Sequence, residues 1–134
     1  MSEGVNGQMI LGVGVDLCSI SRMSRFSRDD HFVSRVFSSE EIDYAFSKHC
    51  PARHLASSFA AREAFSKASG LPLAKVAFKG VSVSRSESGP VLNLKALDEG
   101  LLAQISSSRF HLSLSHEGDY AVAFVVMEGD FRHD

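Results

Sequence analysis

This sequence is poor in the residues that mark secreted and membrane-embedded proteins. Its 134 residues contain no tryptophan, two cysteines and three prolines. Cys18 and Cys50 lie too far apart for a C-x-x-C motif and are too few for a disulfide framework, so we expect a reducing compartment, the cytoplasm. No run of about 18 apolar residues is present, and the polar start lacks the hydrophobic segment of a signal peptide. We therefore expect neither membrane insertion nor secretion.

The sequence also lacks a large excess of positive or negative charge. The net charge is −2, so no basic field indicates a nucleic-acid partner, and attraction to any charged partner must come from a local patch. A hydrophobic fraction of 44% and a charged fraction of 22% are typical of a globular domain with one core. Because the start is polar and contains glycine, we expect a disordered leader over residues 1–8 and a single domain over residues 9–134.

The first strand is predicted over residues 9–17, where apolar residues alternate with other types. One face carries Gly12, Gly14 and Asp16, and the other carries Leu11, Val13, Val15 and Leu17. The two glycines leave their face without side chains, and the acid stands at its far end. A dinucleotide-binding G-x-G-x-x-G motif is excluded, because Leu17 occupies the third glycine position.

The longest helix is predicted over residues 52–69, and Gly70 is suited to ending it. A stripe of small side chains, which allows a close neighbour, is formed by Ala60, Ala64 and Ala68. Glu63 and Lys67 lie one turn apart in the adjacent row. Such a pair can hold a metal ion and a phosphate together, or it can be a solvated ion pair worth about 0.3–0.5 kcal/mol. The helix alone leaves both interpretations open.

The remaining elements are shorter. We expect helical pieces within residues 19–37, a capped helix over residues 40–49, a scaffold helix over residues 95–106, and strands over residues 80–84, 90–94, 110–115 and 120–126. A hairpin loop at residues 116–119 should precede the last strand, and the chain from Glu128 onward is expected to fray. A polar face of the strand at 110–115 is formed by His111, Ser113 and Ser115.

Arginines are concentrated between the first strand and the capped helix. They are Arg22, Arg25, Arg28 and Arg35, interleaved with apolar residues that include Met23 and Phe26. This pattern is typical of a solvated basic face over a packed stripe. It is equally typical of a landing site for an acidic partner, where methionine and phenylalanine supply contact area and the arginines steer the partner.

Four motifs taken together point to one family. They are Gly12-Val-Gly-Val-Asp16-Leu, Phe59-Ala-Ala-Arg-Glu63-Ala-Phe-Ser-Lys67-Ala, Gly89-Pro90, and His111-Leu-Ser-Leu-Ser-His116. In order and spacing, from Met9 to about Glu128, the chain resembles the bacterial holo-acyl-carrier-protein synthases, the small phosphopantetheinyl transferases. Two positions depart from the usual pattern: Arg62 stands where a lysine is common, and Ser58 where an arginine is frequent.

The resemblance implies a fold and a reaction. The fold would be the α+β phosphopantetheinyl transferase fold, a small antiparallel sheet wrapped around a long central helix, assembled as a homotrimer with active sites between subunits. The reaction would move 4′-phosphopantetheine from coenzyme A, as co-substrate, to a serine of apo acyl carrier protein. Adenosine 3′,5′-bisphosphate would be released, and the step would serve fatty acid biosynthesis.

The resemblance also implies roles for single residues. Asp16 and Glu63 would bind Mg²⁺, which takes carboxylate and phosphate oxygens, and the catalytic residues would be Glu63, Lys67 and His111. Contacts to coenzyme A would come from Ser66, Lys67, Gly70, Gly89, Pro90, His111 and Ser113. The acidic carrier protein would dock on Arg22, Met23, Arg25, Phe26, Arg28 and Arg35. The base that takes the serine proton stays open among Glu63, a water on the metal, and His111.

Two other functions use the same residues. A Mg²⁺-dependent phosphohydrolase would employ the same two acids with water as the nucleophile. A carrier-binding module without catalytic activity would keep the pair of Glu63 and Lys67 for structural reasons only.

Overall fold

The computed structural model describes residues 8–78 and 80–130. A three-stranded antiparallel sheet, in the order β1–β5–β4, consists of β1 (Gln8–Ser19), β5 (Tyr120–Asp130) and β4 (Ser108–Glu117). A separate antiparallel hairpin consists of β2 (Ser82–Ser86) and β3 (Gly89–Asn93). The helices are α1 (Ile20–Met23), α2 (His31–Val36), α3 (Ser39–Phe46), α4 (Pro51–Ser69), α5 (Leu73–Ala77) and α6 (Glu99–Gln104).

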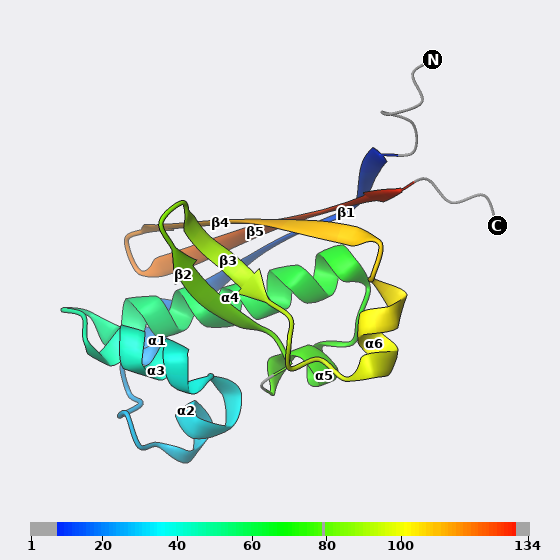
Figure 1. Cartoon of the computed structure of the whole chain (residues 1–134). Helices are drawn as coiled ribbons and strands as arrows, with labels where there is room; N and C mark the ends of the chain where they lie inside the picture. The colour runs from blue at the N-terminus through cyan, green and yellow to red at the C-terminus, as the bar shows by residue number, and fades with distance from the viewer. Residues whose placement is uncertain (1–7, 79, 131–134) are drawn as a thin grey trace.

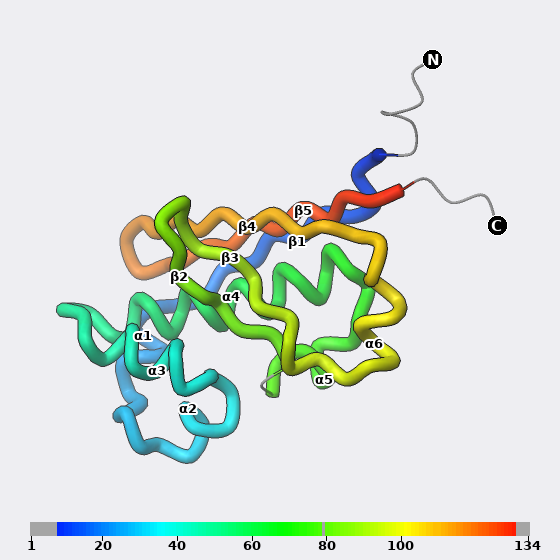
Figure 2. Tube along the Cα trace, viewed as in Figure 1, coloured from blue at the N-terminus to red at the C-terminus, as the bar shows by residue number. Residues whose placement is uncertain are grey.

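The long helix α4 lies at the centre of the molecule. It runs along one face of the three-stranded sheet, the β2–β3 hairpin lies beside it, and the short helices gather at its two ends (Figure 1). The tube in Figure 2 shows that the two ends of the described chain lie close together, where Gln8 of β1 pairs with Asp130 of β5. The expected α+β fold, with a small antiparallel sheet around a long helix, is confirmed.

Glycines in β1 allow the strand to approach α4 closely. A Cβ atom on Gly12 would lie 2.0 Å from the carbonyl oxygen of Ala68, and one on Gly14 would lie 2.0 Å from the carbonyl oxygen of Ala64. The alanine stripe of the helix therefore packs against the bare face of the strand. Because Asp16 is on that same face, this packing brings its carboxylate to α4.

The two faces of the sheet differ. Toward α4, β5 buries Ala121, Ala123, Val125 and Met127. On the opposite face, Val13, Val15 and Leu17 of β1 are 55%, 53% and 60% exposed, and Phe124 of β5 lies beside Val15 in the register. An apolar sheet face is thus left uncovered in the single chain.

Most element boundaries agree with the sequence, and three corrections have clear causes. The helix expected over residues 95–106 is wrong in extent: α6 starts only after Asp98, whose side chain accepts a hydrogen bond from the Leu101 amide at 2.9 Å. Helix α5 was not expected, and it begins directly after Pro72. The hairpin loop is also shorter than residues 116–119, because β4 continues through Glu117 and Gly118 takes a positive φ of 59° in the turn.

The ends of the domain also differ from expectation. β1 starts at Gln8, inside the expected leader. The prediction that the chain frays from Glu128 is wrong for residues 128–130, since β5 continues to Asp130 and the register pairs Glu128 with Ile10 and Arg109. The rest of the leader (1–7) and of the tail (131–134) lies outside the described residues.

The capped helix is confirmed in detail. Ser38 accepts a hydrogen bond from the Glu41 amide at 3.1 Å, and the Glu41 carboxylate accepts one from the Ser38 amide at 2.9 Å. This reciprocal capping box fixes the start of α3. Within the described residues, none of the helices has both the length and the hydrophobicity to cross a lipid bilayer.

Candidate active site

Asp16, Glu63 and Lys67 meet where the end of β1 crosses α4. Lys67 Nζ lies 2.9 Å from Asp16 Oδ1 and donates a second hydrogen bond to the Val15 carbonyl oxygen at 3.1 Å. The carboxyl groups of Glu63 and Asp16 lie close enough for Asp16 to raise the pKa of Glu63. The structure therefore brings together the two predicted metal ligands and the predicted phosphate-binding lysine, although Asp16 and Glu63 lie 47 positions apart in the sequence.

The two carboxylates perturb each other. Burial, the hydrogen bond to Asp16 and the charge of Asp16 raise the pKa of Glu63 from 4.5 to about 7, while Lys67 and Arg22 oppose the rise. The pKa of Lys67 is also raised, chiefly by its hydrogen bond to Asp16. Glu63 therefore keeps its proton at a pH where an ordinary glutamate has lost it. A positive charge in addition to that of Lys67 is stabilised at this place.

The donor set fits a hard divalent cation. Two carboxylates at one point are the usual protein contribution to a Mg²⁺ site, in which waters and substrate phosphates supply the other ligands. Among the described residues, no third histidine, cysteine, aspartate or glutamate joins them in a cluster that could hold a metal. The site is therefore suited to a cation that is shared with a substrate, and less suited to one enclosed by protein.

An open depression of about 490 Å³ adjoins the acids. It is lined by Val15, Asp16, Leu17, Lys67 and Val122. Asp16 and Lys67 form its polar part, and the apolar residues belong to the uncovered region of β1 and β5. The Asp16 carboxylate and the Lys67 ammonium group are open to solvent from this side.

His111 and Ser113 are not part of this cluster in the single chain. Both side chains are exposed on the outer face of β4, the face opposite α4. The Nε2 atom of His111 lies 2.9 Å from Glu128 Oε1, and this contact, together with Arg109, lowers the pKa of Glu128. Within the single chain, the structure does not bring the predicted residues His111 and Ser113 to the carboxylates.

The other predicted coenzyme A contacts lie at two places. Ser66 and Gly70 are at the C-terminal end of α4, where Ser66 Oγ donates to the Leu71 carbonyl at 2.6 Å and Gly70 ends the helix with a φ of 79°. Gly89 and Pro90 start β3 in the hairpin, and Gly89 has a φ of 116°. Ser66 and Gly70 therefore flank Lys67 along the helix, whereas the Gly-Pro pair belongs to a separate element.

The predicted docking residues divide into exposed and buried ones. Met23 is 2% exposed and belongs to the core, so its prediction as a docking contact is wrong: a methionine among arginines was needed for packing. Phe26 is half-buried and stacks on Phe32 with ring centroids 4.6 Å apart. Arg22 is exposed and close enough to lower the pKa of Glu63.

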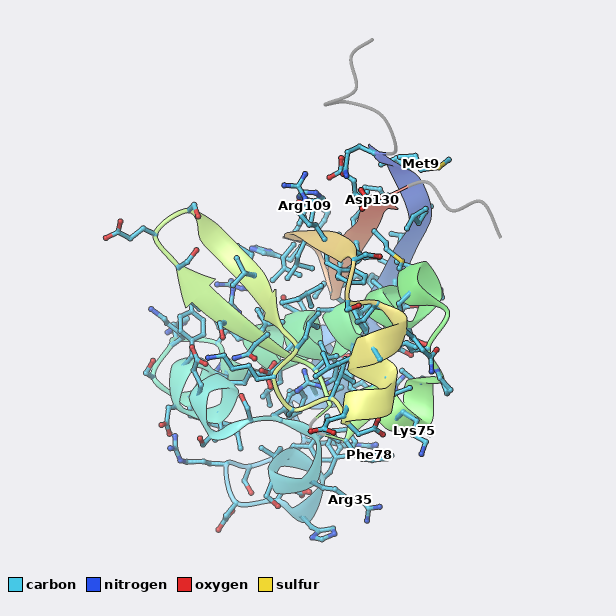
Figure 3. The ribbon with its side chains drawn as sticks, turned by 45° about the vertical axis from the view of Figure 1, so that its right-hand side comes forward. Met9, Arg35, Lys75, Phe78, Arg109 and Asp130 are labelled. Atoms are coloured by element: carbon cyan, nitrogen blue, oxygen red, sulfur yellow. The ribbon has the colours of Figure 1, made fainter. Side chains whose placement is uncertain are left out.

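The remaining three arginines are exposed and each has a neighbour. Arg25 lies over the ring of Phe26, and Arg28 forms an ion pair with Asp43 of α3. Arg35 lies over the ring of Phe78 at 4.8 Å, and the two side chains project from α2 and from the end of α5 in Figure 3. These arginines keep their charge at the surface.

A second basic site was missed by the sequence reasoning. A pocket of about 130 Å³ is lined by Arg53, His54, Ser57, Arg85, Leu114, Ser115 and His116. Burial and the nearby cations, led by Arg53 and Arg85, lower the pKa of His54 to about 4. The signal was weak, because these residues come from α4, β2 and β4 and no local pattern joins them, although His116 closes one of the four motifs.

Comparison with known proteins places this site in a family. Residues 12–125 match the ACPS family of the 4′-phosphopantetheinyl transferase superfamily. A holo-[acyl-carrier-protein] synthase of Treponema denticola is 39% identical over 123 residues, which cover 90% of this chain and 100% of that protein. The chain belongs to this superfamily, and the resemblance seen in the four motifs is confirmed.

Solved structures of related proteins agree with this family assignment. The holo-[acyl-carrier-protein] synthase of Neisseria meningitidis superposes with a TM-score of 0.76 at 32% identity, covering 89% of this chain and 98% of that one. The holo-(acyl-carrier-protein) synthase of Bacillus anthracis in complex with CoA (3′,5′-ADP) has a TM-score of 0.70 at 30% identity, covering 91% of this chain and 99% of that one. The phosphopantetheinyl transferase fold is therefore confirmed.

Proposed function

We propose that this protein is a holo-acyl-carrier-protein synthase that transfers 4′-phosphopantetheine from coenzyme A to a serine of apo acyl carrier protein in fatty acid biosynthesis. The observation that carries the proposal is the meeting of Asp16, Glu63 and Lys67 at one open site. The names of its relatives support the same reaction. We also place the reaction in the cytoplasm, where the two unpaired cysteines would stay reduced.

Asp16 and Glu63 would hold the cation, which we propose to be Mg²⁺. When bound, the cation supplies charge neutralisation to the pyrophosphate of coenzyme A. Lys67 Nζ, exposed and 2.9 Å from Asp16, would bind a phosphate oxygen and stabilise the charge that develops as the bond breaks. In this step a bond forms between the serine oxygen and phosphorus, and the bond from phosphorus to the oxygen of the leaving nucleotide breaks, which releases adenosine 3′,5′-bisphosphate.

The serine must lose its proton during the attack. An unprotonated Glu63, whose pKa is about 7, is able to accept this proton near neutral pH. His111 from a neighbouring copy is the alternative, since within its own chain it contacts Glu128 on the other face of the sheet.

We propose a homotrimer with active sites between subunits. The support is the uncovered apolar face of β1 and β5, with Val13, Val15, Leu17 and Phe124 exposed. This face adjoins the depression beside Asp16 and also carries the polar row of His111 and Ser113. Packing of one copy's sheet face near another copy's acids would bring these two sets together.

The basic pocket around Arg53, His54, Arg85 and His116 would bind phosphate groups of coenzyme A. Burial, and after it the charges of nearby cations led by Arg53 and Arg85, lower the pKa of His54, and phosphate is the anionic part of that co-substrate. Gly89 and Pro90, in the hairpin that carries Arg85, would approach the adenosine end. The exposed arginines Arg22, Arg25, Arg28 and Arg35, with the half-buried Phe26, would receive the acidic carrier protein.

Intact-mass measurement of apo acyl carrier protein tests the reaction. After incubation with coenzyme A, Mg²⁺ and this protein, the carrier should gain about 340 Da, the mass of the attached group. An unchanged carrier mass would refute the proposed function. Nucleotide release without carrier would favour the phosphohydrolase, and a Glu63→Ala variant that still modifies the carrier at the wild-type rate would remove the catalytic assignment.

A further inference from the structure

Arg62 is a fully buried cation beside the site. It precedes Glu63 on α4, yet it is 0% exposed and takes no part in the acid cluster. Its guanidinium forms two hydrogen bonds to the buried carboxylate of Glu41, from Nη2 to Oε1 at 2.6 Å and from Nη1 to Oε2 at 2.9 Å. A charged pair of this kind, withdrawn from water, requires an explanation.

The two side chains make four other hydrogen bonds. One of them, from Arg62 Nη1 to the Ser58 carbonyl oxygen at 3.0 Å, stays within α4, and the other three reach further points of the chain. Arg62 Nη2 donates to the carbonyl oxygen of Val36, the last residue of α2, at 3.0 Å. Glu41 accepts from the amide of Ser38, which caps α3, and from the amide of Val83 in β2 at 2.8 Å. One ion pair thus connects α4 with the end of α2, the start of α3 and β2.

Stability alone does not account for this arrangement. Replacing a buried ion pair by apolar side chains of similar volume is often neutral or stabilising, because two charges must otherwise be desolvated. Apolar side chains cannot reproduce the directional geometry of hydrogen bonds. Each hydrogen bond of the pair fixes the distance and the angle between two elements. The pair therefore fixes how α2 and α3 are placed against α4.

These are the elements that the carrier protein and the phosphoryl group would use. Arg35 lies in α2, immediately before the Val36 carbonyl that Arg62 holds, and Arg28 is tied to α3 through Asp43. Glu63 and Lys67 lie on α4 within five residues of Arg62. The geometry points to Arg62 and Glu41 as positioning residues: they hold the arginine-bearing segment at a fixed place relative to Glu63 and Lys67, so that a docked carrier presents its serine to the site.

This inference rests on the proposed function and makes a separate prediction. The test is a double variant, Arg62→Met with Glu41→Leu, which removes both charges and keeps the volume. Because this variant also removes the Glu41 half of the capping box and the acceptor of the Val83 amide, we expect a lowered melting temperature, an unchanged KM for coenzyme A, and a KM for the carrier raised about tenfold. The same factor should appear in the Kd for a carrier whose acceptor serine is replaced by alanine, a readout that does not depend on turnover.

Two further variants keep the test decisive. Arg62→Lys retains the charge but loses the two-pronged contact, so we expect it to fold and to raise the carrier KM by a smaller factor. Leu97→Ala truncates a core side chain away from the pair and should lower the melting temperature without changing the ratio of the two KM values.

An unchanged carrier KM in both the double variant and Arg62→Lys would overturn the inference, as would an equal rise in the KM for coenzyme A. If the double variant does not fold, the ratio of the carrier KM to the coenzyme A KM in Arg62→Lys decides the question. Failure of the wild type to modify any carrier would instead refute the proposed function, so the two failures are distinguishable.

Discussion

Gly14 of β1 touches the backbone of α4 at Ala64: a Cβ atom on the glycine would lie 2.0 Å from the Ala64 carbonyl oxygen. No flexible side chain is available to move away, because the neighbouring atom belongs to the helix backbone. The distance between strand and helix, and with it the meeting of Asp16 with Glu63, depends on the absence of this one methyl group.

Gly14→Ala should therefore be strongly destabilising. We expect a loss on the order of 3 kcal/mol in the free energy of unfolding, because the strand must move away from the helix. Urea denaturation measures this. Gly100→Ala is the matched control, since that glycine lies in the exposed helix α6 and a Cβ atom there would meet only the Asp98 side chain at 3.4 Å; it should be neutral or slightly stabilising. Equal effects of the two substitutions would contradict the close approach.

Lys67→Met should affect the chemical step and leave the fold intact. Its Nζ is exposed at the site, and its loss removes a positive charge from the place where phosphate charge develops. We expect kcat to fall by about 10²-fold, with a far smaller change in melting temperature. Lys95→Met, at an exposed position outside the acid cluster, is the control and should keep the wild-type kcat. A kcat within twofold of the wild type in Lys67→Met would remove the lysine from the mechanism.

The raised pKa of Glu63 gives the metal-free protein a specific pH dependence. Its folded-state pKa of about 7 lies above the ordinary value of 4.5, so the stability linked to its proton is fully present below about pH 4.5 and is lost as the pH rises through 7. Relative to Glu63→Gln, the wild type without metal should therefore lose melting temperature between about pH 5 and pH 8. Parallel curves for the two proteins would show that the pKa of Glu63 is not raised in the folded protein.

The uncovered sheet face predicts association. Sedimentation equilibrium should give about three times the chain mass of 14.6 kDa. Val15→Asp, which places a charge in the middle of that face, should lower the mass to that of a single chain and reduce activity, because burying an unpaired carboxylate is costly. Ser86→Asp, at an exposed end of the β2–β3 hairpin, should leave the mass unchanged. A wild type that sediments as a monomer would contradict the shared active site.

The acid cluster was predictable because short-range patterns placed each of its members. Alternation in β1 put Asp16 on the glycine face, and a four-residue spacing put Lys67 one turn after Glu63 on the face beside the alanine stripe. These are local rules, and the fold obeys them. The patterns did not say which surfaces meet: the meeting of Asp16 with Glu63 around one metal ion was implied by the family resemblance.

Other features depended on contacts that are distant in the sequence. The burial of Arg62 depends on Glu41, 21 residues earlier, and a cation on a helix is normally exposed. Met23 looked like a surface methionine because four arginines surround it in the sequence. The pocket of Arg53, Arg85 and His116 joins three elements, and His111 lies on the outer face of the sheet beside Glu128, a placement that depends on the pairing of β4 with β5.

The most direct test of the central claim is a Mn²⁺ titration, with Mn²⁺ as a spectroscopic substitute for Mg²⁺, of the wild type, Asp16→Asn and Glu63→Gln, followed by electron paramagnetic resonance. If the two carboxylates share one cation, each single variant should weaken binding by at least about tenfold, while Glu99→Gln, an exposed acid on α6, should bind as the wild type does. Wild-type affinity in either Asp16→Asn or Glu63→Gln would contradict a shared site.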